Sequence, residues 1–307
     1  MKAVHTYKFD LLRPMLESFG GPAMIKPIIT LHALSAVTIS KHFKDFVFIT
    51  DDAGRELAKA CKMPYGEIVS VGESFKAPGD FWIESKIHAY STLQEPFVHF
   101  DTDLFLWKPL PEDFLAADVF AFHSETYAWA AYQRYLSNWA RIIPNFPKLH
   151  EQHYTNRMPI NMAIFGGNNW QAINQYAKFI QDFAASNNWF HDIDAADRKK
   201  INGSIAAIEQ LWGSYLLQDQ QGIRIKFLLT EYQVATNENV PGVELTHLHG
   251  IKQKVDQEKK SHEFLAKLSA KLKEVDETVY NAVEAYTSSE IDIDALLKES
   301  ALHGAHS

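Results

Sequence analysis

The first third of the chain alternates short apolar runs with stretches whose apolar residues recur every three or four positions. Short runs are typical of strands buried on both faces, and the longer period is typical of helices with one buried face. The predicted strands are Ala3–Tyr7, Asp45–Thr50, Ile68–Val71 and Pro96–Leu106. The predicted helices between them are Ile29–Phe43, Arg55–Cys61 and Phe81–Leu93. This order predicts an α/β fold whose mixed, mainly parallel sheet is flanked by helices and binds ligands outside the carboxyl ends of its strands.

The rest of the chain is less regular. Three more strands are predicted at Asp118–His123, Ile160–Phe165 and Ile223–Leu229. The predicted helices are Tyr127–Ile143, Trp170–Ala185 and Ile205–Gln218, and Pro144–Arg157 is a predicted loop. From Lys252 to Thr278 the chain is rich in Lys and Glu at helical spacing, which is typical of a surface or packing helix. We therefore expect an α/β domain over residues 1–255 and a C-terminal helical extension over residues 256–307.

Composition and charge limit the classes of molecule that the protein is expected to bind. The chain has 307 residues, of which 46% are hydrophobic and 22% charged, as in ordinary globular proteins. Its net charge of −8 leaves no broad cationic field for a phosphate backbone, so we expect no nucleic-acid partner. An acidic protein that binds a polyanionic ligand has to neutralise it locally, with a divalent metal, a few basic residues or helix N-termini.

The sequence also bears on location. Cys61 is the only cysteine, which excludes an intramolecular disulfide and a cysteine-based zinc cluster and favours the cytoplasm. No stretch reaches the roughly 18 apolar residues that a transmembrane helix needs. We expect a protein without a transmembrane segment, cytoplasmic or at most peripheral to a membrane.

Asp101-Thr102-Asp103 is the sharpest chemical signal. It follows the apolar run that includes Phe97, Val98 and Phe100. Alternation along a strand points both carboxylates to the same side, where one divalent cation can bind them. The alternative is a strand-end Asp that caps a turn, followed by a surface Asp.

This segment carries a resemblance to a known family. Phe97–Pro111 resembles the DxD region of GT-A fold glycosyltransferases, and the later motifs are most similar to those of family 8 and related retaining transferases. The resemblance implies a Rossmann-like GT-A fold. It also implies that Asp101 and Asp103 bind Mn²⁺ or Mg²⁺, and that the metal holds the diphosphate of a nucleotide sugar.

Two further segments resemble motifs of the same family. Pro159–Gly167 resembles the strand that lies along the donor sugar, which implies a sugar-hydroxyl contact for Asn161, although Ala163 replaces the usual glycine. The alternative is a core strand that ends in a glycine turn. Ile208–Tyr215 resembles the helix start of retaining enzymes, which implies that Glu209 lies under the anomeric carbon and stabilises oxocarbenium character or acts as a nucleophile. The alternative is an exposed helical Glu.

The last matching segment, Thr246–Lys254, resembles the late His-x-x-Gly-x-x-Lys motif. The resemblance implies that His247 completes the metal site, with His249 as the alternative ligand. Gln253 stands where the family has the lysine that holds the diphosphate, so Lys252 or Lys254 has to replace it, and we select Lys254. A structural role for the histidine is the other interpretation.

Other residues are expected to contact the donor or the acceptor. The resemblance implies that Lys86 lies near the donor, although an exposed helical Lys is the commoner explanation, and that Thr6 and Tyr7 contact the base or ribose. Asp51 and Asp52 either contact the nucleotide or cap the helix that follows, and the cap is favoured. The aromatic residues of Trp129–Trp139, with Tyr154, form either an acceptor platform or part of the core, and helical spacing favours the core.

The combined prediction is a metal-dependent glycosyltransferase. It moves a sugar from a nucleotide-diphosphate donor, with a UDP-sugar favoured, to a glycan or other hydroxyl acceptor, with retention at the anomeric carbon. One alternative is a haloacid-dehalogenase-like phosphatase, whose Asp-x-Asp normally continues into a Gly-Thr turn, whereas Leu104-Phe105 follow here. The other is a non-catalytic binding module on a decayed scaffold, favoured by Ala163 and Gln253. The Lys/Glu-rich segment is a possible contact for a homo-oligomer.

Overall fold

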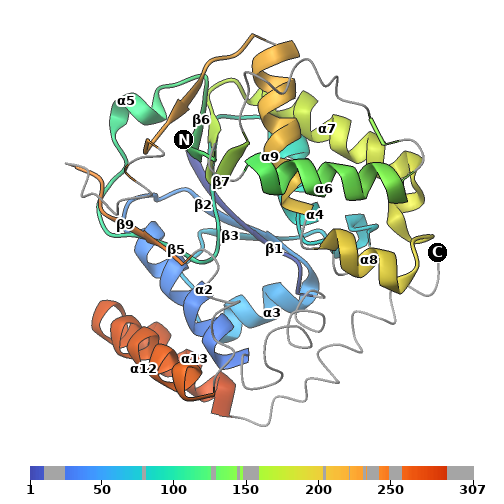
Figure 1. Ribbon diagram of the computed structural model, residues 1–307. Helices are drawn as coiled ribbons and strands as arrows, with labels where there is room; N and C mark the ends of the chain where they lie inside the picture. The colour runs from blue at the N-terminus through green and yellow to red at the C-terminus, as the bar shows by residue number, and fades with distance from the viewer. Residues whose placement is uncertain are drawn as a thin grey trace. The chain divides into compact units, whose positions relative to one another are not determined.

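The computed structural model describes residues 1–9, 25–77, 81–125, 129–143, 146–147, 159–202, 205–220, 222–230, 233, 242–248 and 258–288. The chain divides into two compact units that interleave in sequence. Unit A consists of Lys2–Phe75, Asp101–Pro109 and Glu244–Ser307, and unit B of Met1, Lys76–Phe100 and Leu110–Val243. Both units combine strands with helices, which confirms the predicted α/β class (Figure 1). The domain boundary predicted at residue 255 lies outside the described residues.

Unit A contains three parallel strands, β1 (Lys2–Tyr7), β2 (Phe46–Thr50) and β3 (Glu67–Ser70), with β2 in the middle. Every residue of β2 is buried, as its uninterrupted apolar sequence predicts for a strand covered on both faces. A separate antiparallel pair joins β5 (Leu104–Leu106) to β9 (Leu245–His247). The parallel part of the predicted mixed sheet is therefore confirmed in unit A.

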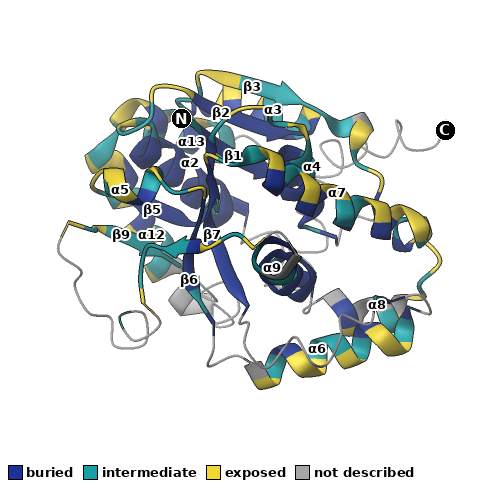
Figure 2. Cartoon of the chain, turned by 90° about the horizontal axis from the view of Figure 1, so that it is seen from above, coloured by how far each residue is buried: buried dark blue, intermediate teal, exposed yellow. Residues whose placement is uncertain are grey.

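The helices of unit A are α2 (Ile25–Ser40), α3 (Asp52–Ala60), α12 (Glu258–Val275) and α13 (Glu277–Ser288). Almost every residue of α2 is buried, because α12 and α13 both pack against it (Figures 1 and 2). Its start at Ile25 precedes the predicted start, with Pro27 accommodated in the first turn, where a helix needs no proline N–H. The packing helix predicted over Lys252–Thr278 is confirmed over Glu258–Val275, but helix α12 ends there and α13 begins at Glu277.

Unit B contains four strands in the order β4 (Phe97–Phe100), β7 (Ile160–Gly167), β6 (Val119–Ser124) and β8 (Ile225–Phe227). The central strand β7 is antiparallel to both neighbours, and β8 pairs parallel to β6. Its helices are α4 (Glu84–Thr92), α5 (Glu112–Leu115), α6 (Trp129–Ile142), α7 (Trp170–Ser186), α8 (Ala195–Asn202) and α9 (Ile205–Ser214). Figure 2 shows α6 with a largely exposed outer face, whereas β6 and β7 are buried.

Two predictions about strand ends are wrong. The strand predicted over Pro96–Leu106 is broken after Phe100 by a turn in which the Leu104 amide donates to the Asp101 carbonyl over 3.1 Å. The glycine turn predicted at Gly166-Gly167 is instead the end of β7, paired with β4. A Cβ atom on Gly166 would lie 2.0 Å from the Phe97 carbonyl oxygen, so glycine is required there for the strands to approach.

Among the described residues, no helix is both long and apolar enough to cross a membrane.

Candidate metal centre and buried polar clusters

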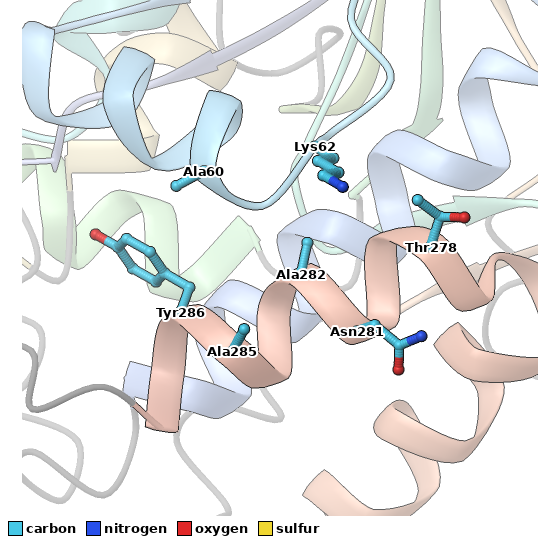
Figure 3. Close-up of a pocket in the computed structure, with 7 residues that line it drawn as sticks. All are labelled: Ala60, Lys62, Thr278, Asn281, Ala282, Ala285 and Tyr286. Atoms are coloured by element: carbon cyan, nitrogen blue, oxygen red, sulfur yellow. The ribbon is translucent and has the colours of Figure 1, made fainter.

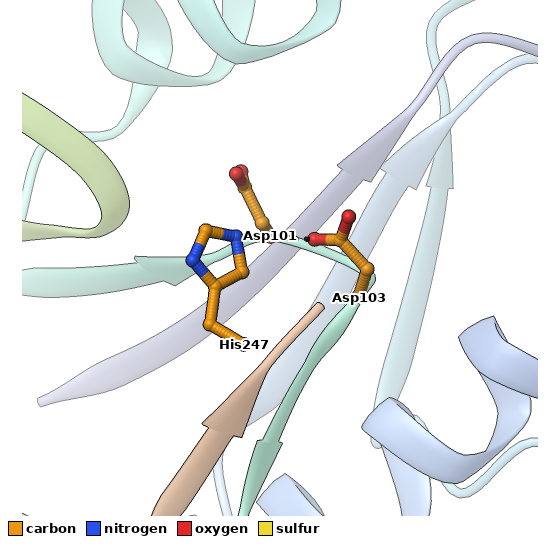
Figure 4. Close-up of side chains that lie close together, drawn as sticks. All are labelled: Asp101, Asp103 and His247. Atoms are coloured by element: carbon orange, nitrogen blue, oxygen red, sulfur yellow. Dashed lines mark ion pairs between the residues drawn. The ribbon is translucent and has the colours of Figure 1, made fainter. Parts of the chain in front are cut away.

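Two carboxylates and one imidazole meet in unit A. Asp101 and Asp103 come from the turn before β5, and His247 is the last residue of β9 (Figure 4). The antiparallel register places Leu104 opposite His247, and the Leu248 amide donates to the Asp103 carbonyl over 3.1 Å. One potential ligand atom from each side chain lies within 4.8 Å of the others, and His247 Nε2 is 3.6 Å from Asp103 Oδ1. Strand pairing therefore assembles this Asp–Asp–His cluster from distant parts of the chain.

The Asp–Asp–His cluster suits a divalent cation. The side chains of His247 and Asp103 are only 9% and 13% exposed, so water screens them poorly. Two carboxylates held close together repel each other unless a cation or proton lies between them. Carboxylate oxygens with one neutral imidazole nitrogen form a donor set that Mn²⁺ accepts readily and Mg²⁺ tolerates. The three side chains predicted as metal ligands therefore lie close enough together to hold one ion.

The end of β1 lies in the same unit. Thr6 is buried, and burial raises the pKa of the Tyr7 hydroxyl, with further contributions from the carboxylates of Asp51 and Asp103. No described residue hydrogen-bonds to the Tyr7 hydroxyl. Asp51 caps α3 by accepting from the Gly54 amide over 2.8 Å and also accepts from the Phe9 amide. The favoured capping role of Asp51 is therefore confirmed.

Unit B holds a buried ion pair between two of the predicted site residues. Lys86 of α4 lies 3.2 Å from the Glu209 carboxylate of α9, and their side chains are 9% and 0% exposed. The Lys86 ammonium also lies 5.2 Å from the centre of the Trp82 ring, within the range of a cation–π interaction. The alternatives of an exposed Lys86 and an exposed Glu209 are wrong, because each charge is buried against its partner.

The third predicted residue of unit B, Asn161, belongs to a buried hydrogen-bond network. Its amide nitrogen donates to Glu125 over 2.7 Å, and its oxygen accepts from the Ala163 amide over 3.0 Å. Tyr132 of α6 donates to the other Glu125 oxygen and also contacts Gln210 of α9. Four polar side chains from four segments thus hold one another in place.

Sequence reasoning missed Glu125 and Gln210. Glu125 directly follows a buried apolar strand, which is the signal that identified Asp101, so the same rule could have selected it. Tyr132 and Trp139 of α6 are buried, which confirms the core interpretation for them. The predicted residues Tyr154, His249, Lys252 and Lys254, and also Gln253, lie outside the described residues.

A pocket of about 470 Å³ also lies in unit A, between the end of α3 and α13 (Figure 3). Among the described residues, its lining includes three alanines, Tyr286 and Lys62, and none of the three residues of the Asp–Asp–His cluster.

Comparisons with known proteins identify the family of this chain but not its activity. No curated protein matches the chain. Among solved structures, the apo form of mouse xyloside xylosyltransferase 1 is similar over 82% of this chain and 98% of its own, with a TM-score of 0.38 and 9% identity. The model of the family of unknown function DUF6734 matches residues 1–286, and the chain therefore belongs to that family.

Proposed function

We propose that this protein is a metal-dependent glycosyltransferase that takes its sugar from a nucleotide-diphosphate donor, with a UDP-sugar favoured, and transfers it with retention to a glycan or other hydroxyl acceptor. The observation that carries the proposal is the convergence of Asp101, Asp103 and His247 after a buried strand. An acidic chain needs local positive charge to bind a diphosphate, and this cluster is where a divalent cation would provide it.

Asp101, Asp103 and His247 would hold Mn²⁺ or Mg²⁺. The bound cation would supply electrostatic stabilisation for the negative charge that develops on the departing diphosphate. Thr6 and Tyr7, at the end of β1, are proposed to contact the nucleotide, and this role is supported by the Tyr7 hydroxyl, to which no described residue hydrogen-bonds. Lys254 is proposed to contact the diphosphate on the strength of the motif alone.

Three residues of unit B are proposed to act on the donor: Lys86 near it, Glu209 under the anomeric carbon of its sugar, and Asn161 on a sugar hydroxyl. Glu209 is fully buried and paired with Lys86, which favours an electrostatic role for its carboxylate over that of a nucleophile. A nucleophile has to reach the anomeric carbon, and a carboxylate with no exposed surface that is held by an ammonium is poorly placed to do so. Its charge would act on the sugar together with that of Lys86, as an oriented ion pair in a medium of low dielectric constant. Asn161 is held by Glu125, so its amide is preorganised for a hydroxyl group.

Calorimetric titration of UDP and GDP, each with and without Mn²⁺, tests the donor site. We expect one nucleotide to bind the wild type only with the metal, and Asp103→Asn to abolish that binding. Asp182→Asn, in an exposed pair with Lys178 on α7, is the matched control and is expected to bind like the wild type. Equal binding by the wild type and Asp103→Asn would refute the proposed site.

A second assay separates an enzyme from a binding module. A transferase that binds its donor commonly hydrolyses it slowly, so we expect Mn²⁺-dependent release of UDP from a UDP-sugar. Tight, metal-dependent binding without transfer or hydrolysis of any nucleotide sugar would favour the non-catalytic alternative.

A further inference from the structure

Helix α2 presents two buried hydroxyl groups to the strand that follows the metal-binding turn. The Ser35 hydroxyl donates to the Leu104 carbonyl over 2.6 Å and lies 3.5 Å from the Asp101 carbonyl oxygen. Three residues later, Thr38 Oγ1 accepts from the Leu106 amide over 3.2 Å. On the other edge of β5 the Trp107 amide bonds to Glu244, so α2 and β9 hold β5 from both sides.

The hydrogen bonds of Ser35 differ from that of Ser40, another serine of α2. A serine within a helix commonly bonds to a carbonyl of its own preceding turn, as Ser40 does with Val37 over 3.0 Å. Ser35 is fully buried and reaches both carbonyl groups that bracket the turn Asp101–Leu104. That turn carries both carboxylates of the Asp–Asp–His cluster.

The Ser35 hydroxyl stands at the end of a row of hydrogen-bonding groups formed by His32, Tyr65 and His5. The Tyr65 hydroxyl oxygen lies 2.7 Å from His32 Nε2 and 2.8 Å from His5 Nδ1. On the other side of the His5 ring, Nε2 lies 3.3 Å from Ser35 Oγ. If both imidazoles carry their proton on Nε2, His32 donates to Tyr65, Tyr65 to His5, and His5 to Ser35. The oxygen of Ser35 is then occupied as an acceptor, and its proton is directed to Leu104. Burial and the neighbouring His32 lower the pKa of His5, which favours the neutral ring that this row requires.

We propose that Ser35 is a positioning residue of the metal centre, whose hydroxyl fixes the turn Asp101–Leu104 and thereby the two carboxylates. The register of β5 with β9 places Leu104 opposite His247, so displacement of Leu104 disturbs all three ligands. Partners that hold metal ligands in place typically contribute 10- to about 100-fold to metal affinity. The inference rests on the proposed function only in taking Asp101, Asp103 and His247 as metal ligands.

Titration of the purified full chain with Mn²⁺ alone, followed by electron paramagnetic resonance of the free ion, tests this role. We expect Ser35→Ala to bind Mn²⁺ about 10-fold more weakly than the wild type. Ser40→Ala removes a hydroxyl of the same helix that bonds to the Val37 carbonyl of the preceding turn, and is expected to keep wild-type affinity. Thr38→Val breaks the other bond from α2 to β5 and serves as the control for a general loss of stability.

Urea unfolding of the metal-free variants separates positioning from stability. We expect Ser35→Ala and Thr38→Val to lower the urea midpoint similarly, while only Ser35→Ala loses Mn²⁺ affinity. Wild-type affinity in Ser35→Ala would overturn the inference and leave the proposed function intact, as would an equal loss in Thr38→Val. Absence of Mn²⁺ binding by the wild type would overturn both.

Discussion

At the scale of single residues, unit B depends on charges that are stable only in pairs. Transfer of an ammonium or a carboxylate from water to a protein interior is costly, and an opposite charge at hydrogen-bond distance offsets most of that cost. Lys86 and Glu209 lie 3.2 Å apart with almost no exposed surface, and the Trp82 ring adds its negative face to the environment of the ammonium. Neither residue can be changed without consequence for the other.

Glu209→Gln is expected to lower the free energy of unfolding by about 3–5 kcal/mol, because it removes the negative charge that lies 3.2 Å from the buried Lys86 ammonium. Urea unfolding measures this directly. The matched control is Asp113→Asn, which breaks an exposed pair with Lys226 and should leave the urea midpoint almost unchanged. The double variant Lys86→Met with Glu209→Leu should recover much of the loss, and equal midpoints for Glu209→Gln and the wild type would contradict the importance of the pair.

His5 is expected to make stability depend on pH. Burial lowers its pKa well below the ordinary value, with a further lowering by His32 and an opposing effect of Asp103, while Tyr65 and Ser35 hydrogen-bond to its ring. The unfolded chain then binds a proton that the folded chain does not, so this contribution is present above about pH 6.5 and is lost as the pH falls. The loss approaches about 1.4 kcal/mol per pH unit. Urea unfolding between pH 7 and pH 5 should therefore have a shallower pH slope for His5→Asn, and identical slopes would show that His5 does not titrate differently on folding.

At the scale of elements, close contact between strands requires particular residues. Gly166 lies opposite Val98 of β4 and Phe120 of β6, in the middle of four paired strands. Alanine there would place its Cβ 2.0 Å from a backbone oxygen that cannot rotate away. Gly166 therefore determines how closely β7 packs against β4.

Gly166→Ala is expected to destabilise the fold by about 3 kcal/mol or more, through separation of β7 from β4. Gly66→Ala is the control, because a Cβ at that position would lie 3.5 Å from the nearest backbone atom, an ordinary contact. Thermal unfolding of both variants provides the comparison. A melting temperature for Gly166→Ala equal to that of Gly66→Ala would contradict the close approach.

The sequence predicted the elements better than their ends. Strands β2, β6 and β7 were recognisable because their apolar runs reflect burial on both faces, a property that each segment carries by itself. The start of a separate strand at Leu104 was not predicted, since the apolar pattern continues through Leu104–Leu106 and the turn before it depends on contacts with α2 and β9. The pairing of Glu209 with Lys86 was not predicted for the same reason, because the two residues lie on different helices.

At the scale of the whole molecule, charge limits what the protein can bind. A chain with a net charge of −8 repels a nucleotide diphosphate at long range, and binding then requires a local positive charge of high density. A divalent cation in the Asp–Asp–His cluster would reverse the sign of the potential at one place without altering the rest of the surface. Metal and nucleotide are therefore expected to bind in a coupled manner, each raising the affinity for the other.

Metal binding is also expected to stabilise the molecule, because the three ligands come together only in the folded chain. At a Mn²⁺ concentration 100-fold above the dissociation constant, the free energy of unfolding should rise by about 2.7 kcal/mol. The thermal midpoint of the wild type should rise with Mn²⁺ and return with EDTA, whereas that of Asp103→Asn should not respond. Hydrogen exchange should slow in β5 and β9, where the ligands are held, and change little in α7 of unit B. Stabilisation that persists in Asp103→Asn would place the ion elsewhere, because a cation bound through surface carboxylates does not depend on the turn after Phe100.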